Sequence, residues 1–193
     1  MIIVTKPAGL LSVPGKAAGT EDCLVSRVQA AHPEALLVHR LDMDTSGVMV
    51  FAASKQAQRH LGLQFERRHV EKLYVADVAG EIADDSGVVD LPLICDWPNR
   101  PLQMVCHVTG KAARTEWQVM AREDGVTRVA LRPLTGRSHQ LRVHMLAIGH
   151  PILGDRFYGD ATRAERMHLH AAELSFFHPD GGARVTYAAP LPF

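Results

Sequence analysis

The amino-acid sequence predicts an α+β fold, in which a mixed, mainly antiparallel sheet is flanked by helices and loops. Three observations favour this class. Strand-like segments occur in clusters, only three segments have helical periodicity, and the two kinds do not alternate as in a parallel βαβ fold. A chain of 193 residues, of which 47% are hydrophobic, can build one core. We therefore expect a single domain over residues 1–193.

The composition excludes several broad classes. Charged residues make up 22% of the chain, which together with its apolar content is not the composition of a disordered protein. No apolar run approaches the roughly 20 residues that cross a bilayer, and the N-terminus does not resemble a signal peptide. Three scattered cysteines, Cys23, Cys95 and Cys106, form neither a disulfide framework nor a zinc motif. We therefore expect a cytoplasmic protein without membrane contact.

The charges are balanced overall but unevenly distributed along the chain. The 21 basic and 21 acidic residues cancel, which by itself argues against a nucleic-acid partner. Residues 77–96, however, contain six acidic residues and no Lys or Arg, whereas residues 132–166 contain six arginines and three acidic residues. The protein can therefore present one basic face, or its charges can simply be solvated, and both interpretations stay open.

The N-terminal part predicts a short strand, a loop and a helix. Residues 2–4 favour a strand, and residues 6–15 are rich in turn formers yet apolar, which indicates an ordered loop against the core. Thr20 can cap a helix whose first turn is acidic. The residues that this helix is expected to bury are Leu24, Val25 and Val28.

The next elements follow from local signals. Residues 48–53 have the composition of a buried strand, and Ser54 can cap a helix that ends near Arg67. The inward face of that helix is expected to carry Ala57, Leu61 and Phe65. Residues 115–120 and 128–132 predict two strands, because Glu123-Asp124-Gly125 between them is typical of a hairpin turn.

The C-terminal part predicts one more helix and two more strands. Residues 138–148 fit a helix that ends at Gly149, with Pro151 just beyond it. Its inward residues are expected to be Leu141, Met145 and Ile148. Residues 169–177 and 184–188 predict the last strands.

A strand expected over residues 70–78 has two different faces. Leu73 and Val75 fall on one side, whereas Lys72, Tyr74 and Ala76 fall on the other. A tyrosine on the less apolar side can stack on a nucleic-acid base. It can equally be a partly buried packing residue.

A polar segment over residues 39–47 lies between two apolar ones, 36–38 and 48–51. A loop that is fixed on both sides by core strands can hold a reactive group in place. The alternative is a polar hairpin in which Asp44 or Ser46 caps the turn.

A second polar segment covers residues 134–145. Gly136 allows a sharp entry and Ser138 can cap the following helix, which places Arg137 at the helix mouth. An arginine there can pair with a carboxylate and keep it ionised, or it can be one of several solvated side chains. His139 and His144 are five residues apart and face different sides of a helix, so zinc is not favoured.

These segments together resemble the RluA family of pseudouridine synthases. The segments that follow the family's order are Lys6-Pro7-Ala8-Gly9-Leu10, His39-Arg40-Leu41-Asp42 with Thr45-Ser46-Gly47, Lys72-Leu73-Tyr74-Val75-Ala76, Gly136-Arg137-Ser138-His139-Gln140-Leu141-Arg142-Val143-His144 and His150-Pro151-Ile152-Leu153-Gly154-Asp155. The resemblance runs from about residue 5 to the end of the chain. It implies a bent sheet with the active site in a central cleft, and isomerisation of uridine to pseudouridine in RNA without a cofactor or a metal.

The resemblance also implies roles for individual residues. Asp42 falls on the family's catalytic aspartate, Tyr74 on its base-stacking tyrosine, and Arg137 on the arginine that pairs with the catalytic carboxylate. Arg40 falls on a position that helps to displace the target base, a step that is required because a stacked uridine cannot be reached. Asp42 would either add to the sugar or remove a proton from C2′, and both routes stay open. Further RNA contacts are expected from His39, Thr45, Arg100, His139 and Arg142.

The target is inferred from two features of the resemblance. Compared with relatives, the strand before Lys6 is abbreviated or the start is late, and there is no room for an S4 RNA-binding domain. Together with residues 96–101, this resembles the dual-specificity branch, which modifies 23S ribosomal RNA at position 746 and tRNA at position 32. We expect structured RNA as the partner and no obligate protein partner. A TruC-like synthase for another tRNA uridine, a non-catalytic RNA-binding module and an aspartate-dependent phosphatase are the alternatives.

Overall fold

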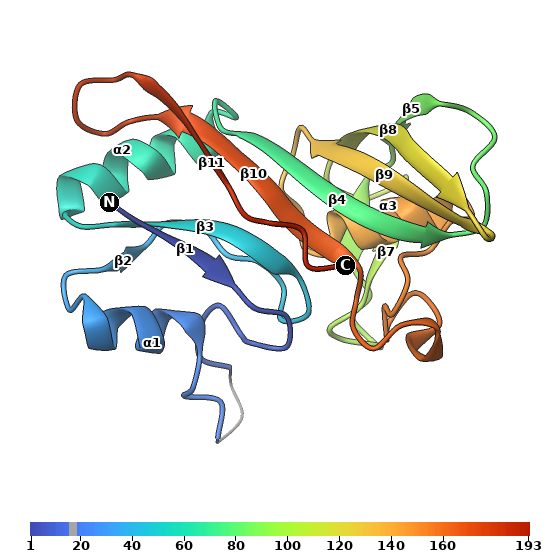
Figure 1. Ribbon diagram of the computed structural model, residues 1–193, viewed down its shortest axis with the longest axis horizontal. Coiled ribbons are helices and arrows are strands. Elements are labelled where there is room, and N and C mark those ends of the chain that lie inside the picture. The colour runs from blue at the N-terminus through green and yellow to red at the C-terminus, as the bar shows by residue number, and fades with distance from the viewer. Residues whose placement is uncertain (16–18) are drawn as a thin grey trace. The chain divides into compact units, whose positions relative to one another are not determined.

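A computed structural model describes residues 1–15 and 19–193 of the chain and confirms the α+β class (Figure 1). Its contacts divide the chain into two compact units. The first comprises Met1–Lys72 with His170–Pro192, and the second comprises Leu73–Leu169 with Phe193. The single domain expected over residues 1–193 stays a prediction. In the part of the chain that is described, no helix combines the length and apolar character needed to cross a membrane.

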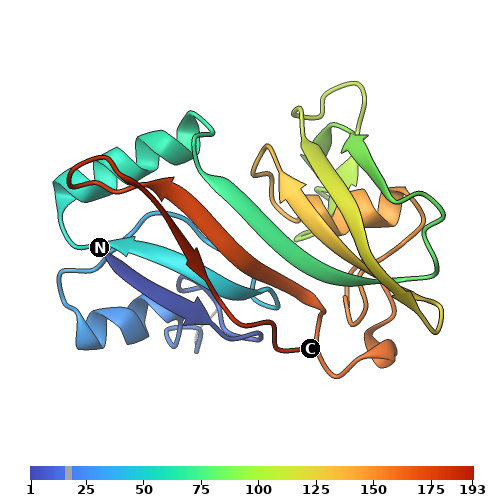
Figure 2. The same cartoon turned by 45° about the horizontal axis from the view of Figure 1, so that its top comes forward.

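The first unit is built on a sheet whose centre is β3, Ser46–Ala52 (Figure 1, Figure 2). Strands β1 (Ile2–Lys6) and β2 (Leu36–Leu37) pair antiparallel with β3, and β10 (Leu169–Phe177) runs parallel to it. Strand β11, Arg184–Ala188, pairs antiparallel with β10. Every residue of β3 is buried, so the core holds in place the residues that adjoin the two ends of this strand.

Helix α2, Lys55–Glu66, forms as predicted and packs on β3. The Ser54 hydroxyl accepts a hydrogen bond from the Ala57 backbone N–H at 3.1 Å, which satisfies one of the first-turn donors. Ala57 and Leu61 are buried in the core of the unit, and Phe65 packs against that core.

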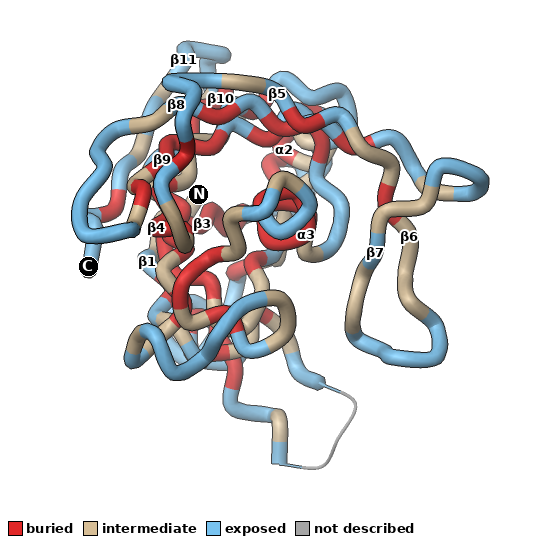
Figure 3. Tube along the Cα trace, turned by 90° about the vertical axis from the view of Figure 1, so that its right-hand side faces the viewer, coloured by how far each residue is buried: buried red, intermediate tan, exposed pale blue. Residues whose placement is uncertain are grey.

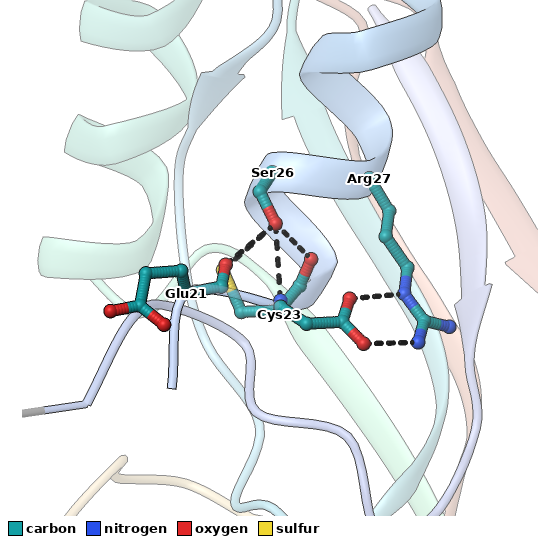
Figure 4. A network of polar contacts seen from close by, with 5 residues as sticks. Glu21, Cys23, Ser26 and Arg27 are labelled. Atoms are coloured by element: carbon teal, nitrogen blue, oxygen red, sulfur yellow. Dashed lines mark hydrogen bonds and ion pairs between the residues drawn. The ribbon is translucent and has the colours of Figure 1, made fainter. Parts of the chain in front are cut away.

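The start of helix α1, Leu24–Ala31, differs from the prediction. Cys23 rather than Thr20 is the N-cap residue. The Ser26 hydroxyl accepts from the Cys23 backbone N–H at 3.1 Å and lies 2.9 Å from the Glu21 carbonyl (Figure 4). The backbone N–H groups of Leu24 and the next residue donate to carbonyls of the preceding loop, Leu11 and Ser12. Because the loop satisfies these donors, no cap from Thr20 is needed.

The second unit contains an antiparallel sheet in the order β4-β9-β8-β5. These strands are β4 (Glu71–Ala79), β5 (Ser86–Asp90), β8 (Arg114–Glu123) and β9 (Val126–Pro133). The other elements are the hairpin strands β6 (Leu93–Cys95) and β7 (Gln103–Val105), helix α3 (Gln140–Ala147) and a 3₁₀ turn, η1 (Ala161–Arg163). The short strands β5, β6 and β7 carry too little periodicity to be predicted.

The β8–β9 hairpin confirms its predicted turn. Asp124 has φ 51° and Gly125 has φ 72°, the two left-handed residues that a tight two-residue hairpin requires. Both strands are longer than predicted because the pairing continues down to Glu123 and Val126.

Both faces of β4 are covered near its C-terminal end, whereas the sequence predicts one solvent or functional face. Ala76 and Val78 belong to the hydrophobic core of the second unit, and Tyr74 packs against it. The opposite face carries the buried Asp77, which accepts two hydrogen bonds from Arg128 at 2.7 and 2.8 Å. The pair with Arg128 compensates the burial of the Asp77 carboxylate on this face.

Helix α3 begins later than predicted. His139, not Ser138, is its N-cap, with a left-handed backbone at φ 52°. Leu141 and Met145 are buried as expected, and Gly149, at φ 89°, follows the last turn.

The acidic stretch of the sequence, residues 77–96, is partly neutralised in the second unit. Three of the acidic residues in the stretch 77–96 form ion pairs with arginines of β8 and β9. These pairs are Asp77–Arg128, Asp85–Arg122 and Asp90–Arg114.

Candidate active site

The residues predicted for the site are divided between the two units. Those in the first unit precede or begin β3: His39, Arg40, Asp42 and Thr45. Those in the second unit are Tyr74, Arg100, Arg137, His139 and Arg142. The pairing of Asp42 with Arg137 and the stacking role of Tyr74 stay predictions.

The loop that carries Asp42 is anchored on both sides of this residue. The Ser12 hydroxyl donates to the Leu41 carbonyl at 2.7 Å and accepts from the Leu41 backbone N–H at 3.1 Å. The Asp42 carbonyl accepts from the Thr45 N–H at 3.2 Å, which closes a turn over the intervening residues. These bonds fix the backbone of the half-buried Asp42.

A buried lysine supports the same loop from β1. Lys6 is fully buried, and its ammonium donates to the carbonyls of Pro7, Leu10 and Met43 at 2.8, 2.7 and 2.8 Å. An ammonium has three donors, so three carbonyl partners compensate the loss of water. Lys6 thus joins the turn-rich loop after β1 to the residue that follows Asp42.

The end of the loop is fixed to β10. The Ser46 hydroxyl lies 2.7 Å from Nδ1 of the buried His170, whose Nε2 lies 3.2 Å from the Ala189 carbonyl. Gly47 has φ 125°, and a Cβ there would lie 2.3 Å from the carbonyl oxygen of Ala171. Only glycine allows this close approach of the two strands.

The side chain of His39 contacts residues of β3 and α2. Its Nε2 accepts a hydrogen bond from the Val50 backbone N–H at 3.1 Å, and its ring stacks on Phe65 with 4.6 Å between centroids. Burial, and then the positive charge of Lys72, lower the pKa of His39 to about 3. Burial and the nearby Arg68 in turn lower the pKa of Lys72 to about 8. A neutral His39 can accept the hydrogen bond from Val50, and this bond attaches the loop to β3.

Two of the expected RNA contacts are contradicted. Thr45 is 3% exposed, so its side chain does not reach solvent. Arg142 is 2% exposed, and its guanidinium donates to both carboxylate oxygens of Asp155 at 2.7 Å. A buried bidentate pair of this kind holds the protein together and is not offered to phosphate.

Arg137, by contrast, is exposed at the entrance to α3. The buried Gln140 accepts a hydrogen bond from its backbone N–H at 3.0 Å, and the Nε of Arg137 donates to the Ala112 carbonyl at 3.1 Å. Gln140 also donates to the Arg114 carbonyl and to the Thr115 hydroxyl, both at 3.0 Å. The segment before the helix is therefore held by side chains of the helix itself.

Tyr74, His139 and Arg100 are at least partly exposed in the second unit, and their contacts with RNA stay predictions. Tyr74 is half-buried, opposite Leu131 on β9. His139 is half-buried, and its Nδ1 lies 2.7 Å from the Tyr158 hydroxyl. Arg100 is exposed, and its guanidinium carbon lies 3.3 Å from the centre of the Trp97 ring. The exposed Arg40 completes the group on the first unit.

Residues 1–147 match the family model described as "RNA pseudouridylate synthase". The chain belongs to the RNA pseudouridylate synthase family. It is 54% identical to a Dual-specificity RNA pseudouridine synthase RluA of Yersinia pestis, over 100% of this chain and 96% of the relative. The Escherichia coli (strain K12) protein of the same name is 53% identical, over 100% of this chain and 90% of the relative.

Solved structures agree with this assignment. Human RNA Pseudouridylate Synthase Domain Containing 1 superimposes with a TM-score of 0.82 at 29% identity, over 99% of this chain and 80% of that one. The human Domain Containing 4 protein gives 0.77 at 26% identity, over 98% and 85%. The resemblance seen in the sequence is thereby confirmed, and the protein is a pseudouridine synthase that acts on RNA.

The sequence did not assign roles to the residues that hold the synthase's loops. Lys6, Ser12 and Gln140 are buried polar side chains that bond to backbone groups on either side of the predicted site residues. One signal was available for each. Each is a polar residue in a segment that is otherwise apolar: the end of a strand, a loop and the start of a helix. Burial is expected in such segments, and a buried polar group needs a hydrogen-bond partner.

Proposed function

We propose that this synthase has dual specificity and converts uridine to pseudouridine at position 746 of 23S ribosomal RNA and at position 32 of tRNA, in the cytoplasm. The observation that carries the proposal is the 54% identity over the whole chain to a relative named for dual specificity. A small RNA hairpin suits this chain, because an irregular loop can be recognised through splayed bases and backbone shape.

Asp42 is proposed to act on the ribose of the target nucleotide. Its carboxylate would add to the sugar or remove the C2′ proton, so that the bond from the base nitrogen to C1′ breaks and a bond from C5 of the uracil to C1′ replaces it. C5 of the uracil releases its proton and N1 takes up a proton, so the product is an isomer of the substrate and no electron is gained or lost. The anchoring of the loop by Lys6 and Ser12 supports this role, because the reaction requires a carboxylate that does not move when the base turns.

The other site residues are proposed to stabilise the charge of Asp42 and to bind the base. Arg137 would keep Asp42 ionised through a bidentate pair, since an opposite charge within about 4–6 Å favours the carboxylate. Tyr74 would stack on the detached uracil and prevent its loss. The exposed Arg40 would take the place that the base leaves in the RNA stack.

The test is incubation of the pure protein, without added metal, with an rRNA hairpin and a tRNA anticodon stem-loop, followed by mapping of pseudouridine. Hairpins with cytidine at the target position serve as the control. We expect product at one position in each wild-type hairpin and none in the controls. Product in the tRNA hairpin alone, at a different uridine, would replace dual specificity with the TruC-like alternative.

A further inference from the structure

The loop between β6 and β7 presents an exposed aromatic side chain beside a cation. Trp97 is 64% exposed, far more than the buried Trp117, and the guanidinium of Arg100 lies over its ring at 3.3 Å. Among the described residues, no ion pair joins Arg100 to a carboxylate. Figure 3 shows this hairpin as an exposed and half-buried segment of the second unit. An exposed indole with a guanidinium on its ring is a surface on which a nucleic-acid base can stack.

The backbone of this tip, residues 96–102, is ordered by its own hydrogen bonds. Asp96 donates its N–H to the Leu102 carbonyl at 2.9 Å, and Leu102 donates to the Asn99 carbonyl at 3.0 Å. Asn99 donates its backbone N–H and its side-chain amide to Asp96, at 3.1 and 3.0 Å. The indole and the guanidinium are therefore held on a formed turn, which lowers the entropy that a ligand must overcome.

The base of the hairpin is tied to the predicted site residues of the second unit. Leu93 is buried in a small cluster with Ala113 and Val143. At the other strand, the Gln103 backbone N–H donates to the Tyr158 hydroxyl at 2.8 Å, and that hydroxyl also lies 2.7 Å from Nδ1 of His139. The hairpin thus has a fixed position relative to the segment that carries Arg137.

Indole and guanidinium planes are the two side-chain surfaces on which unpaired bases stack, and a cation over the ring adds attraction for the RNA backbone. We propose that Trp97, with Arg100, stacks on an unpaired base of the RNA loop other than the target uridine. This inference rests on the proposed function. It makes the β6–β7 hairpin a specificity element for hairpin substrates, separate from the residues that handle the reacting nucleotide.

The kinetic test compares Trp97→Ala, Trp97→Phe and Met120→Ala on both RNA hairpins. Met120 is a control, because it is 57% exposed on β8 and has no role in the proposal. Loss of one stacked base is worth about 1–3 kcal/mol, so Trp97→Ala should raise KM about 5- to 150-fold with little change in kcat. Trp97→Phe should keep most of the affinity, and Met120→Ala should behave as wild type.

Fluorescence supplies a second readout that does not depend on turnover. The chain has two tryptophans, and Trp117 is 9% exposed, so quenching by added hairpin RNA should come from Trp97. Trp97→Phe should abolish the quenching. If wild type quenches but forms no pseudouridine, the proposed function fails and the stacking stands. If wild type is active and Trp97→Ala keeps both its KM and its RNA affinity, the inference is overturned, and a protein partner becomes the better explanation for the exposed indole.

Discussion

The Asp42 loop, residues 39–47, and the hairpin tip, residues 96–102, are both held by hydrogen bonds, but the partners in these bonds differ. The Asp42 loop is held by side chains distant in the sequence, Lys6, Ser12 and His170. The hairpin tip is held by hydrogen bonds among its own residues and exposes its largest side chain. The position proposed for the chemistry is thus held by the core, whereas the position proposed to stack on RNA is held by a local turn. Substitutions should therefore affect stability in the first region and binding in the second.

The largest expected difference is between two cations. Lys6→Met removes a fully buried ammonium and leaves three carbonyls without their donor, so it should lower the free energy of unfolding by about 3–5 kcal/mol. Arg100→Met changes an exposed cation and should shift it by no more than about 0.5 kcal/mol. Urea unfolding measures both. Equal effects would remove the distinction between the two regions.

A pair of glycine substitutions tests the contact between the loop end and β10. Gly47→Ala should destabilise by at least about 3 kcal/mol, because the new Cβ would meet the backbone of Ala171 at 2.3 Å and the φ of 125° is unfavourable for alanine. Gly62→Ala lies in α2, where a Cβ meets nothing within 4 Å, and should stabilise by about 0.5–1 kcal/mol. Thermal unfolding of the two variants should shift in opposite directions; a small shift for Gly47→Ala would mean that the strands can separate cheaply.

Two hydrogen-bonding side chains give a smaller effect. Ser12→Ala should cost about 1–2 kcal/mol, because both backbone groups of Leu41 lose a buried partner, and it should also slow turnover. Asn99→Ala removes an exposed bond to Asp96 and should leave both stability and kcat near wild type. Denaturant midpoints and single-turnover rates distinguish them. A normal rate for Ser12→Ala would show that Asp42 does not depend on this anchor.

The last comparison concerns pH. His39 has a folded-state pKa of about 3 against an ordinary value of 6.5, so the unfolded chain takes up this proton more readily. The stability that neutral His39 contributes is fully present above pH 6.5 and is lost as the pH falls toward 3. His39→Gln can still accept from Val50 and should be less sensitive to acid over this window than wild type. Urea midpoints at pH 7 and at mildly acidic pH test this, and parallel losses would contradict it.

Local signals were sufficient for much of the fold. Ser54 and the apolar face of α2, and the Asp124-Gly125 turn, act within a few residues and were predicted correctly. The caps at Thr20 and Ser138 were wrong, because loop carbonyls satisfy the donors of α1 and because His139 takes a left-handed conformation before α3. A local pattern cannot show which groups tertiary contacts supply.

Residues of the candidate site could be named where a sequence motif contains them. They could not be named where contacts between distant parts of the chain determine their role. Asp42 and Arg137 could be named from their segments, whereas Lys6 reaches a carbonyl 37 residues away, which no periodicity reveals. Arg142 was misassigned for the same reason, since its partner Asp155 lies beyond the helix. The sequence therefore names candidate residues for the chemistry, which stay predictions, but it does not show which charged residues are buried.

The most direct measurement is release of tritium from RNA hairpins that carry [5-³H]uridine at the target position. Pseudouridine formation replaces the C5 hydrogen, so wild type should release tritium in step with product. Asp42→Asn keeps the shape of the side chain but cannot act as a carboxylate, and it should bind the same hairpins and release none, whereas Asp44→Asn should retain turnover. Tritium release by Asp42→Asn at a rate close to wild type would contradict the assignment of the reaction to Asp42.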